Sequence, residues 1–146
     1  MRRFGEARVA GQTYRRRPGA YVILPLGDKV LLTHQREPQR EFQLPGGGID
    51  PGETAIQALH REVFEETGWR IGPPRKLGVY RRFAYMPEYD LWAEKVCHVY
   101  VARPVRPHGA PSEPGHSAHL VNAELAIGLV GSEGDAAFLA RCLASA

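Results

Sequence analysis

Cysteine is scarce in this sequence: Cys97 and Cys142 are the only two among its 146 residues. A chain of this length can bury a sizeable core without covalent or metal crosslinks, so a disulfide-dense scaffold is excluded. Both cysteines have apolar neighbours along the chain. We interpret them as reduced thiols of the core rather than as partners in a disulfide.

The sequence also lacks long apolar runs. The longest ones, such as Ala20–Leu26 and Val99–Ala102, are far shorter than the roughly 20 residues of a membrane-spanning helix. The first five residues lack the apolar core of a signal peptide. We therefore expect no membrane association and a cytoplasmic location.

Neither hydrophobic nor charged residues are in excess, at 43% and 24% of the chain, which excludes wholesale disorder and fibrous architectures. We expect one globular domain over residues 1–146. The net charge of +3 is modest, but arginines cluster at residues 15–17 and 81–82. Such clusters attract phosphates in some proteins and form a solvated face in others, and both interpretations stay open here.

No internal repeat is present, and the composition shifts only in the segment Pro104–Ser117, which is rich in proline, glycine, histidine and serine. This segment predicts a long loop. A short strand, His119–Val121, follows it. Alternating apolar residues predict four earlier strands, the first two joined as a hairpin through residues 26–29. These strands are Ala20–Pro25, Val30–His34, Lys76–Tyr85 and Glu94–Ala102.

Helices are predicted at three places. The pattern of Thr54 followed by Gln57 is a capping box, and it predicts a helix over 55–67 that ends before Gly68. Asn122 can cap a second helix that runs through Leu129, and a last helix is expected over 135–143. The whole pattern indicates a mixed α/β protein with helices packed on a sheet.

The central helix predicts an apolar stripe beside an acidic face. At about 100° per residue, Ile56, Leu59 and Val63 share one arc and are expected to be buried. Glu62, Glu65 and Glu66 share the neighbouring arc, where each like-charged pair costs roughly 0.2–0.5 kcal/mol and opposes the helix dipole. Either Arg61 and water on a solvated face or a divalent cation would offset this repulsion. Mg²⁺ and Mn²⁺ prefer such carboxylate oxygens.

A glycine-rich loop, Leu44–Glu53, precedes this helix. Glycine lets the backbone approach a metal or a phosphate closely, and the helix start offers unpaired N–H groups. The segment Gly47–Trp69 then resembles the Nudix box, G-x5-E-x7-R-E-U-x-E-E-x-G-U with U aliphatic, and covers 23 of the 146 residues. Its one departure is Trp69 at the final aliphatic position. The resemblance implies the α/β (α+β) Nudix fold, a mixed sheet sandwiched between helices.

The resemblance also implies the site and the reaction. Nudix proteins of this kind hydrolyse a phosphoanhydride bond in a nucleoside diphosphate linked to another moiety, using Mg²⁺, or Mn²⁺ as a substitute, and a water nucleophile. Glu53 and Arg61 are implied to pair and to orient the glutamates, and Glu113 in the long loop is a candidate general base or further ligand. The implied metal ligands are Glu62, Glu65, Glu66 and the Gly46 carbonyl.

The substrate is left open by the sequence. Tyr85 lies where a tyrosine is associated with dinucleoside polyphosphate hydrolases, and residues 47–54 also resemble RNA 5′-pyrophosphohydrolases. Arg81, Arg82 and Tyr85 are candidate substrate-binding residues, although core or loop packing is the more common role for any one of them. A nucleotide-type small molecule is the expected partner, with an RNA 5′ end as the alternative. A non-catalytic nucleotide-sensing domain is a further alternative, and a homodimer stays open.

Overall fold

The computed structural model of the protein describes residues 1–145. Within them, a five-stranded sheet has the order β1-β8-β9-β2-β6, and a four-stranded sheet contains β11-β4-β3 with β5 paired to β4. Strands β10 and β7 form a third, two-stranded sheet. The strands are β1 (Arg2–Arg3), β2 (Arg15–Ile23), β3 (Pro25–Leu26), β4 (Lys29–Gln35), β5 (Glu41–Gln43), β6 (Gly46–Gly48), β7 (Trp69–Ile71), β8 (Arg75–Met86), β9 (Leu91–Val101), β10 (Pro104–Pro107) and β11 (His116–Asn122). The helices are α1 (Ala55–Thr67), the 3-10 turn η1 (Pro87–Tyr89), α2 (Ala123–Leu129) and α3 (Glu133–Ala144).

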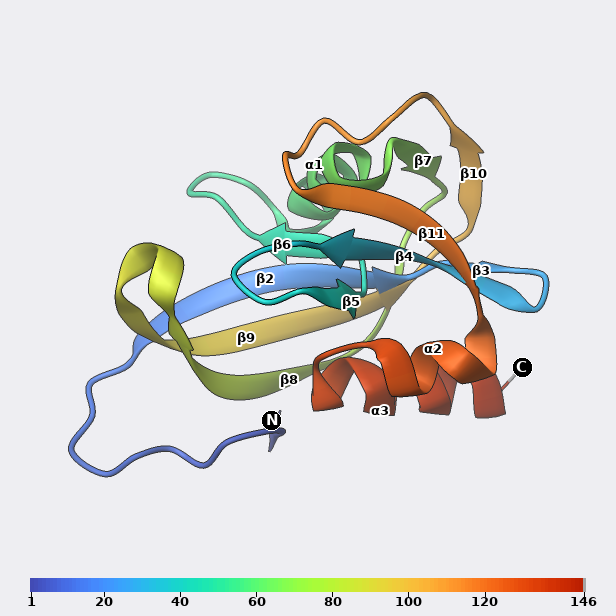
Figure 1. The fold of residues 1–146 in the computed structure, drawn as a ribbon. Coiled ribbons are helices and arrows are strands. Elements are labelled where there is room, and N and C mark those ends of the chain that lie inside the picture. Colours follow the sequence, from blue (N-terminus) through green and yellow to red (C-terminus); the bar gives the residue numbers. More distant parts are fainter. Residues whose placement is uncertain (146) are drawn as a thin grey trace.

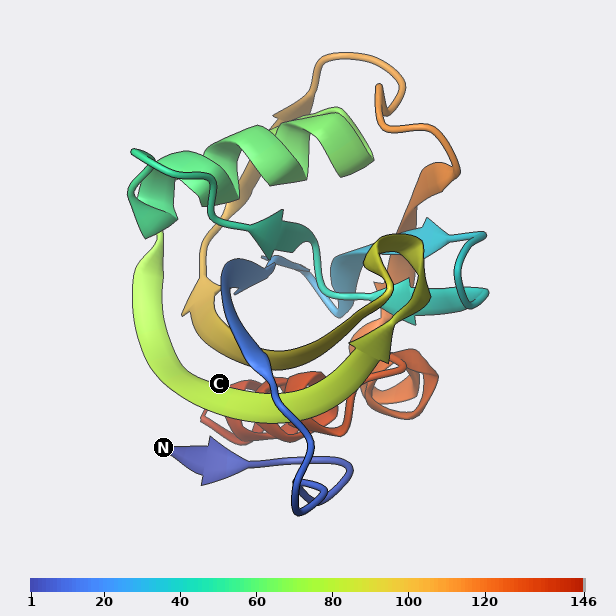
Figure 2. The same ribbon diagram turned by 90° about the vertical axis from the view of Figure 1, so that its left-hand side faces the viewer.

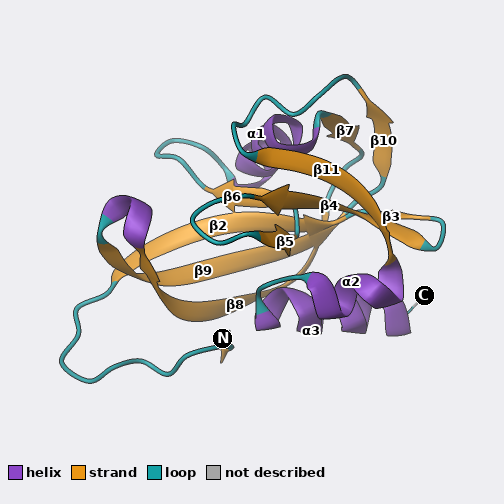
Figure 3. Cartoon of the chain, viewed as in Figure 1, coloured by secondary structure: helices purple, strands orange, loops and turns teal. Residues whose placement is uncertain are grey.

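The five-stranded and four-stranded sheets lie between α1 on one side and α2 with α3 on the other, and β7 and β10 lie beside α1 (Figure 1). Strand β2 runs parallel to β9 and antiparallel to β6, while β8 and β9 are antiparallel. Figure 2 shows β8 as a long curved strand between the two helical layers, and Figure 3 distinguishes the strands from the helices by colour. The predicted mixed sheet sandwiched between helices is confirmed.

The second half of strand β2, residues 19–23, is largely buried on both faces because each face meets a different helical layer. Ala20 and Val22 join the core beneath α1, where they meet Leu59 and Val63. Ile23 belongs to the other core, on the side of α3. Successive side chains of a strand point to opposite faces, so one apolar strand serves both layers.

Helix α1 has the predicted bounds, and both arms of the capping box are present. Gly68 ends it with φ 75°, the left-handed conformation that favours glycine. The predicted burial of Ile56 is wrong, because this residue is 36% exposed while Ala58 is fully buried. Glu66, which is only 6% exposed, belongs to the buried arc of the helix, and Ile56 lies in the first helical turn, ahead of the buried residues Ala58 and Leu59.

Two predictions on the strands need correction. The turn between Leu26 and Lys29 is present, but only β3 pairs with β4 across it. The longer strand β2 belongs to the other sheet, because the chain changes sheets after Ile23. The predicted loop Pro104–Ser117 is also too long. It contains β10, which pairs with β7, and the first residues of β11, so the connecting segment covers 108–115.

The C-terminal half follows the sequence pattern more closely. Helix α2 begins after Asn122, whose side chain accepts hydrogen bonds from two backbone N–H groups, and α3 extends the last predicted helix by a residue or two at each end. Cys97 is buried, Cys142 packs at the edge of the same core, and both thiols are free. Among the helices of residues 1–145, none has the length and apolar character needed to cross a membrane.

Candidate active site

The site begins where β6 passes beneath α1, and glycine makes this approach feasible. Gly46 has φ 144°, and a Cβ there would lie 2.1 Å from the carbonyl oxygen of Ala20. At Gly47 a Cβ would lie 2.6 Å from the carboxyl carbon of Glu62. Both distances are far below van der Waals contact, so a side chain at position 46 would push β6 away from β2, and one at position 47 would displace the carboxylate of Glu62.

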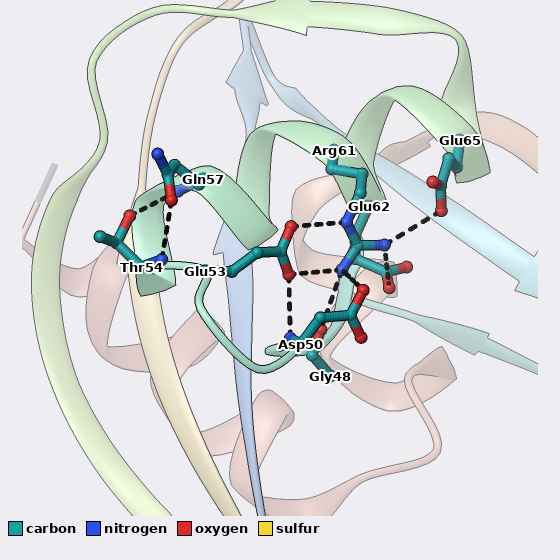
Figure 4. A network of polar contacts seen from close by, with 8 residues as sticks. All are labelled: Gly48, Asp50, Glu53, Thr54, Gln57, Arg61, Glu62 and Glu65. Carbon is teal, nitrogen blue, oxygen red and sulfur yellow. Dashed lines mark hydrogen bonds and ion pairs between the residues drawn. The ribbon is translucent and has the colours of Figure 1, made fainter.

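Arg61 organises the carboxylates around the start of the helix (Figure 4). Its Nε and Nη2 atoms donate to the two oxygens of Glu53 at 2.7 and 2.8 Å, a two-point contact that a lysine cannot reproduce. Nη1 donates to Glu62 at 2.9 Å and reaches Glu65 at 3.4 Å, and Nη2 also donates to the carbonyl of Gly48. One guanidinium therefore connects the loop, the helix and β6.

Charge is crowded on the face of α1 that meets β6. The backbone N–H of Gly46 donates to Glu66 Oε1 at 2.9 Å, but burial dominates and raises the pKa of this carboxyl well above its usual range. Burial also raises the pKa of Glu62. The Arg61 hydrogen bond has the opposite effect on the pKa of Glu53, which it lowers to about 2. The carboxyls of the half-buried Glu62 and the buried Glu66 thus need further positive charge to ionise readily.

The donor set fits a hard divalent cation, because Glu62, Glu65 and Glu66 offer only carboxylate oxygens from one helix face. As the side chains stand in residues 1–145, no three acidic, histidine or cysteine groups converge on one point. Arg61 takes an oxygen of Glu62 and contacts Glu65. A bound ion would therefore compete with the guanidinium for these two carboxylates.

The segment 108–115 is attached to the end of α1. The backbone N–H groups of Ser112 and Glu113 both donate to the carbonyl of Glu65, at 2.9 and 2.8 Å, and that of His108 donates to the carbonyl of Gly68. The Glu113 side chain is exposed. These contacts bring Glu113 to the same helix end as Glu65 and satisfy carbonyls that lack partners within the helix.

A cleft of about 260 Å³ opens beside Glu62 and Glu66 and is also lined by His116. His116 Nδ1 lies 2.8 Å from the hydroxyl oxygen of Thr33 and 3.7 Å from Glu66 Oε2. Burial lowers the pKa of this histidine. Sequence reasoning missed both His116 and Thr33, because His116 falls in a segment read as a loop and its contact requires the pairing of β11 with β4.

The three candidate substrate-binding residues are separated by the alternation of β8. Arg82 lines the cleft, whereas Arg81 faces the other side of the sheet and contacts Glu94 at 3.3 Å. The Tyr85 hydroxyl donates to Asp90, and its ring lies 5.2 Å from that of Trp92. Of these three residues, Arg82 alone is among those that line the cleft within residues 1–145.

Comparison with known proteins agrees with this arrangement. The model of the NUDIX domain matches residues 15–140, which is most of the chain. The chain belongs to the Nudix family. A solved MutT protein structure from Bacillus halodurans superimposes with a TM-score of 0.68 at 20% identity, covering 84% of this chain and 79% of that one. This likeness supports the Nudix fold described above.

Two curated relatives match shorter stretches. A putative 8-oxo-dGTP diphosphatase of Bacillus subtilis is 39% identical over 74 residues, which cover 51% of this chain and 50% of the relative. An RNA pyrophosphohydrolase of Serratia proteamaculans is 44% identical over 52 residues, or 36% of this chain and 30% of the relative. The matches thus span half or less of the length of these relatives.

Proposed function

We propose that this Nudix protein is a divalent-cation-dependent hydrolase that cleaves a phosphoanhydride bond in a nucleoside diphosphate linked to another moiety. One observation carries the proposal. Glu66 is buried against the backbone N–H of Gly46, with Glu62 beside it in the cleft and both carboxyl pKa values raised. A carboxylate pair held in this way is costly unless a cation compensates it, and the phosphate under attack needs the same cation to come close to these carboxylates.

Glu62, Glu65, Glu66 and the carbonyl of Gly46 would hold Mg²⁺, with Mn²⁺ as a substitute. When bound, the metal ion acidifies a water molecule and neutralises phosphate oxygens. The chain itself contributes orientation. Arg61 fixes the carboxylates through its contacts with Glu62 and Glu65, and Glu53 fixes Arg61 in turn.

The proton of the attacking water needs an acceptor. We assign this role to Glu113, whose backbone N–H donates to the carbonyl of Glu65 near the C-terminal end of α1 and whose side chain is exposed. A loop residue can move toward the substrate as it binds, so its position without substrate does not exclude it. Glu62, Glu65 and Glu66 are the alternative acceptors.

The relatives guide the choice of substrates, since they are named as an 8-oxo-dGTP diphosphatase and an RNA pyrophosphohydrolase. We propose a nucleoside triphosphate or a 5′-triphosphorylated RNA as the substrate class, with a dinucleoside polyphosphate as the alternative. A purely sensing role is disfavoured, because every acidic position of the box is retained.

The test is a panel of these three substrate types with Mg²⁺ or Mn²⁺, with products identified by mass. Turnover of at least one type is expected, releasing pyrophosphate, phosphate or a nucleoside monophosphate. Glu66→Gln is expected to lose turnover and to weaken Mn²⁺ binding measured by electron paramagnetic resonance. Glu124→Gln, an exposed change on α2, is the matched control. Absence of turnover across the panel together with unchanged Mn²⁺ binding by Glu66→Gln would refute the proposal.

A further inference from the structure

Three basic side chains form a row across the floor of the cleft. Arg17 on β2 lies opposite Lys95 on β9, and Lys95 lies opposite Arg82 on β8. Residues directly opposite one another on neighbouring strands project from the same face of the sheet. All three line the cleft that also contains Glu62 and Glu66. The acidic face of α1 and the basic row thus belong to one cavity.

The basic row has no counter-charge in direct contact. Within residues 1–145, Arg17, Lys95 and Arg82 make no ion pair with a carboxylate, although each is partly buried. The arginines that alternate with them on the same strands behave differently, since Arg16 and Arg81 both contact Glu94 on the outer face. The two outer arginines share the carboxylate of Glu94, whereas the inner row has no carboxylate within ion-pair distance in residues 1–145.

Burial adds to the cost of this arrangement. Burial, together with the positive charge of Arg82, lowers the pKa of Lys95. Glu88 and Asp135 also line the cleft, but neither lies within ion-pair distance of the row. Partly buried cations without an ion-pair partner are unfavourable unless an anion binds them, and phosphate is an anion that guanidinium and ammonium groups bind strongly.

Arg82 and Lys95 also line a second cavity of about 920 Å³, which adjoins the cleft. Its walls include Gln35, Gln39 and Gln43, whose amide groups both donate and accept hydrogen bonds. Ligand sites generally enclose roughly 300–1,000 Å³. The second cavity therefore has room for a nucleotide in addition to the group held beside the glutamates.

We propose that Arg17, Lys95 and Arg82 bind a phosphate group of the substrate that is not under attack, and direct a second nucleotide into the larger cavity. This inference rests on the proposed function of the same cleft. The substrate class is one in which a second nucleotide is joined through phosphate to the group being cleaved. A 5′-triphosphorylated oligonucleotide and a dinucleoside polyphosphate share this chemistry.

The first test needs no catalysis. Pyrophosphate binding to the metal-free protein is measured by calorimetry for the wild type, Lys95→Gln and Arg82→Gln. Each variant is expected to bind about tenfold more weakly or worse. Arg16→Gln, an exposed change on the outer face of the same strand as Arg17, is expected to bind like the wild type. Equal affinity in all four proteins would overturn the proposal.

The second test separates substrate positioning from chemistry. With Mg²⁺, Lys95→Gln is expected to raise KM about tenfold or more for a 5′-triphosphorylated dinucleotide or a dinucleoside tetraphosphate, with kcat within about threefold of the wild type. The substrate that shows the larger effect identifies the source of the second nucleotide. The effect on a nucleoside triphosphate is expected to be smaller, because it lacks that nucleotide. An equal rise in KM for all three substrates would refute the assignment of the larger cavity.

Two precautions keep these tests decisive. If Lys95→Gln or Arg82→Gln melts far below the wild type, Arg17→Gln replaces it, since Arg17 lines the same cleft and belongs to the same basic row. Absence of turnover by the wild type would count against the proposed function alone. The pyrophosphate measurement would still decide whether the basic row binds phosphate.

Discussion

Replacing Arg61 by alanine should weaken both the fold and the activity. The change removes a two-point contact with Glu53 and the contacts with Glu62 and Glu65. It also leaves the like charges of the helix face without their nearest cation. Hydrogen bonds to charged groups contribute about 1.5–3 kcal/mol when buried, whereas exposed ion pairs contribute about 0.2–1 kcal/mol. The Arg61 side chain is 31% exposed, so an intermediate total applies.

We expect a destabilisation of about 2 kcal/mol for Arg61→Ala, above the range for an exposed ion pair and in the lower half of the range for a hydrogen bond to a charged group. For a chain of this size, that loss corresponds to a fall in Tm of about 4–8 °C. Arg61→Lys should recover only part of the stability, because an ammonium group cannot form the two-point contact. The activity of both variants should fall at saturating Mg²⁺, since the carboxylates lose their orientation.

The dependence of this destabilisation on pH provides a sharper check. The Arg61 hydrogen bond holds the pKa of Glu53 at about 2, below that of an unfolded chain. The stabilisation is therefore fully present above the unfolded pKa of roughly 4.3 and is lost as the pH falls through about 2. The difference in Tm between the wild type and Arg61→Ala, followed by circular dichroism, should shrink over that interval. Equal Tm values and equal kcat at pH 7 would show that the pair neither supports the fold nor orients the site.

Three further outcomes are expected. Excess EDTA should abolish turnover and added Mg²⁺ or Mn²⁺ should restore it, and full activity in EDTA would rule out the metal mechanism. Glu65→Gln and Glu66→Gln should each lower kcat by at least about 10²-fold with the fold intact, as judged by circular dichroism, whereas near wild-type rates would place the site elsewhere. Glu113→Gln should lower kcat by about 10- to 10³-fold with little change in KM and should remove the acidic limb of the pH–rate profile. If Glu113→Gln keeps the acidic limb of the pH–rate profile, the general base is one of the glutamates of α1 instead.

The parts of the fold that the sequence predicted correctly are those that local interactions determine. Helix α1 begins after Thr54 and ends before Gly68, because capping depends on residues within one turn of each helix end. The burial of Ile56 was mispredicted because burial, unlike capping, depends on parts of the chain that are distant in the sequence. An apolar stripe indicates a preferred face, but the depth of each residue depends on the sheet beneath it, which also buries Glu66.

The parts that could not be predicted depend on the pairing of distant strands. Nothing near Lys95 in the sequence indicates that it lies opposite both Arg17 and Arg82, since that follows from the order of three strands. Equally, the position of His116 beside Glu66 requires β11 to pair with β4. Alternation along a strand does indicate that Arg81 and Arg82 face opposite sides, but it cannot tell which side contains the cleft.

The double role of β2 has a consequence for folding fidelity. The same nine-residue strand carries Arg17 into the cleft and packs its Ala20 carbonyl against Gly46, where even a Cβ would not fit. A slip of one residue in its pairing would turn Arg17 outward and, in the same step, dislodge the backbone that contacts Glu66. A misregistered molecule would therefore lose phosphate binding and the acidic platform together. The proposed catalytic activity would thus depend on the correct register of a strand whose partner β9 is remote in the sequence.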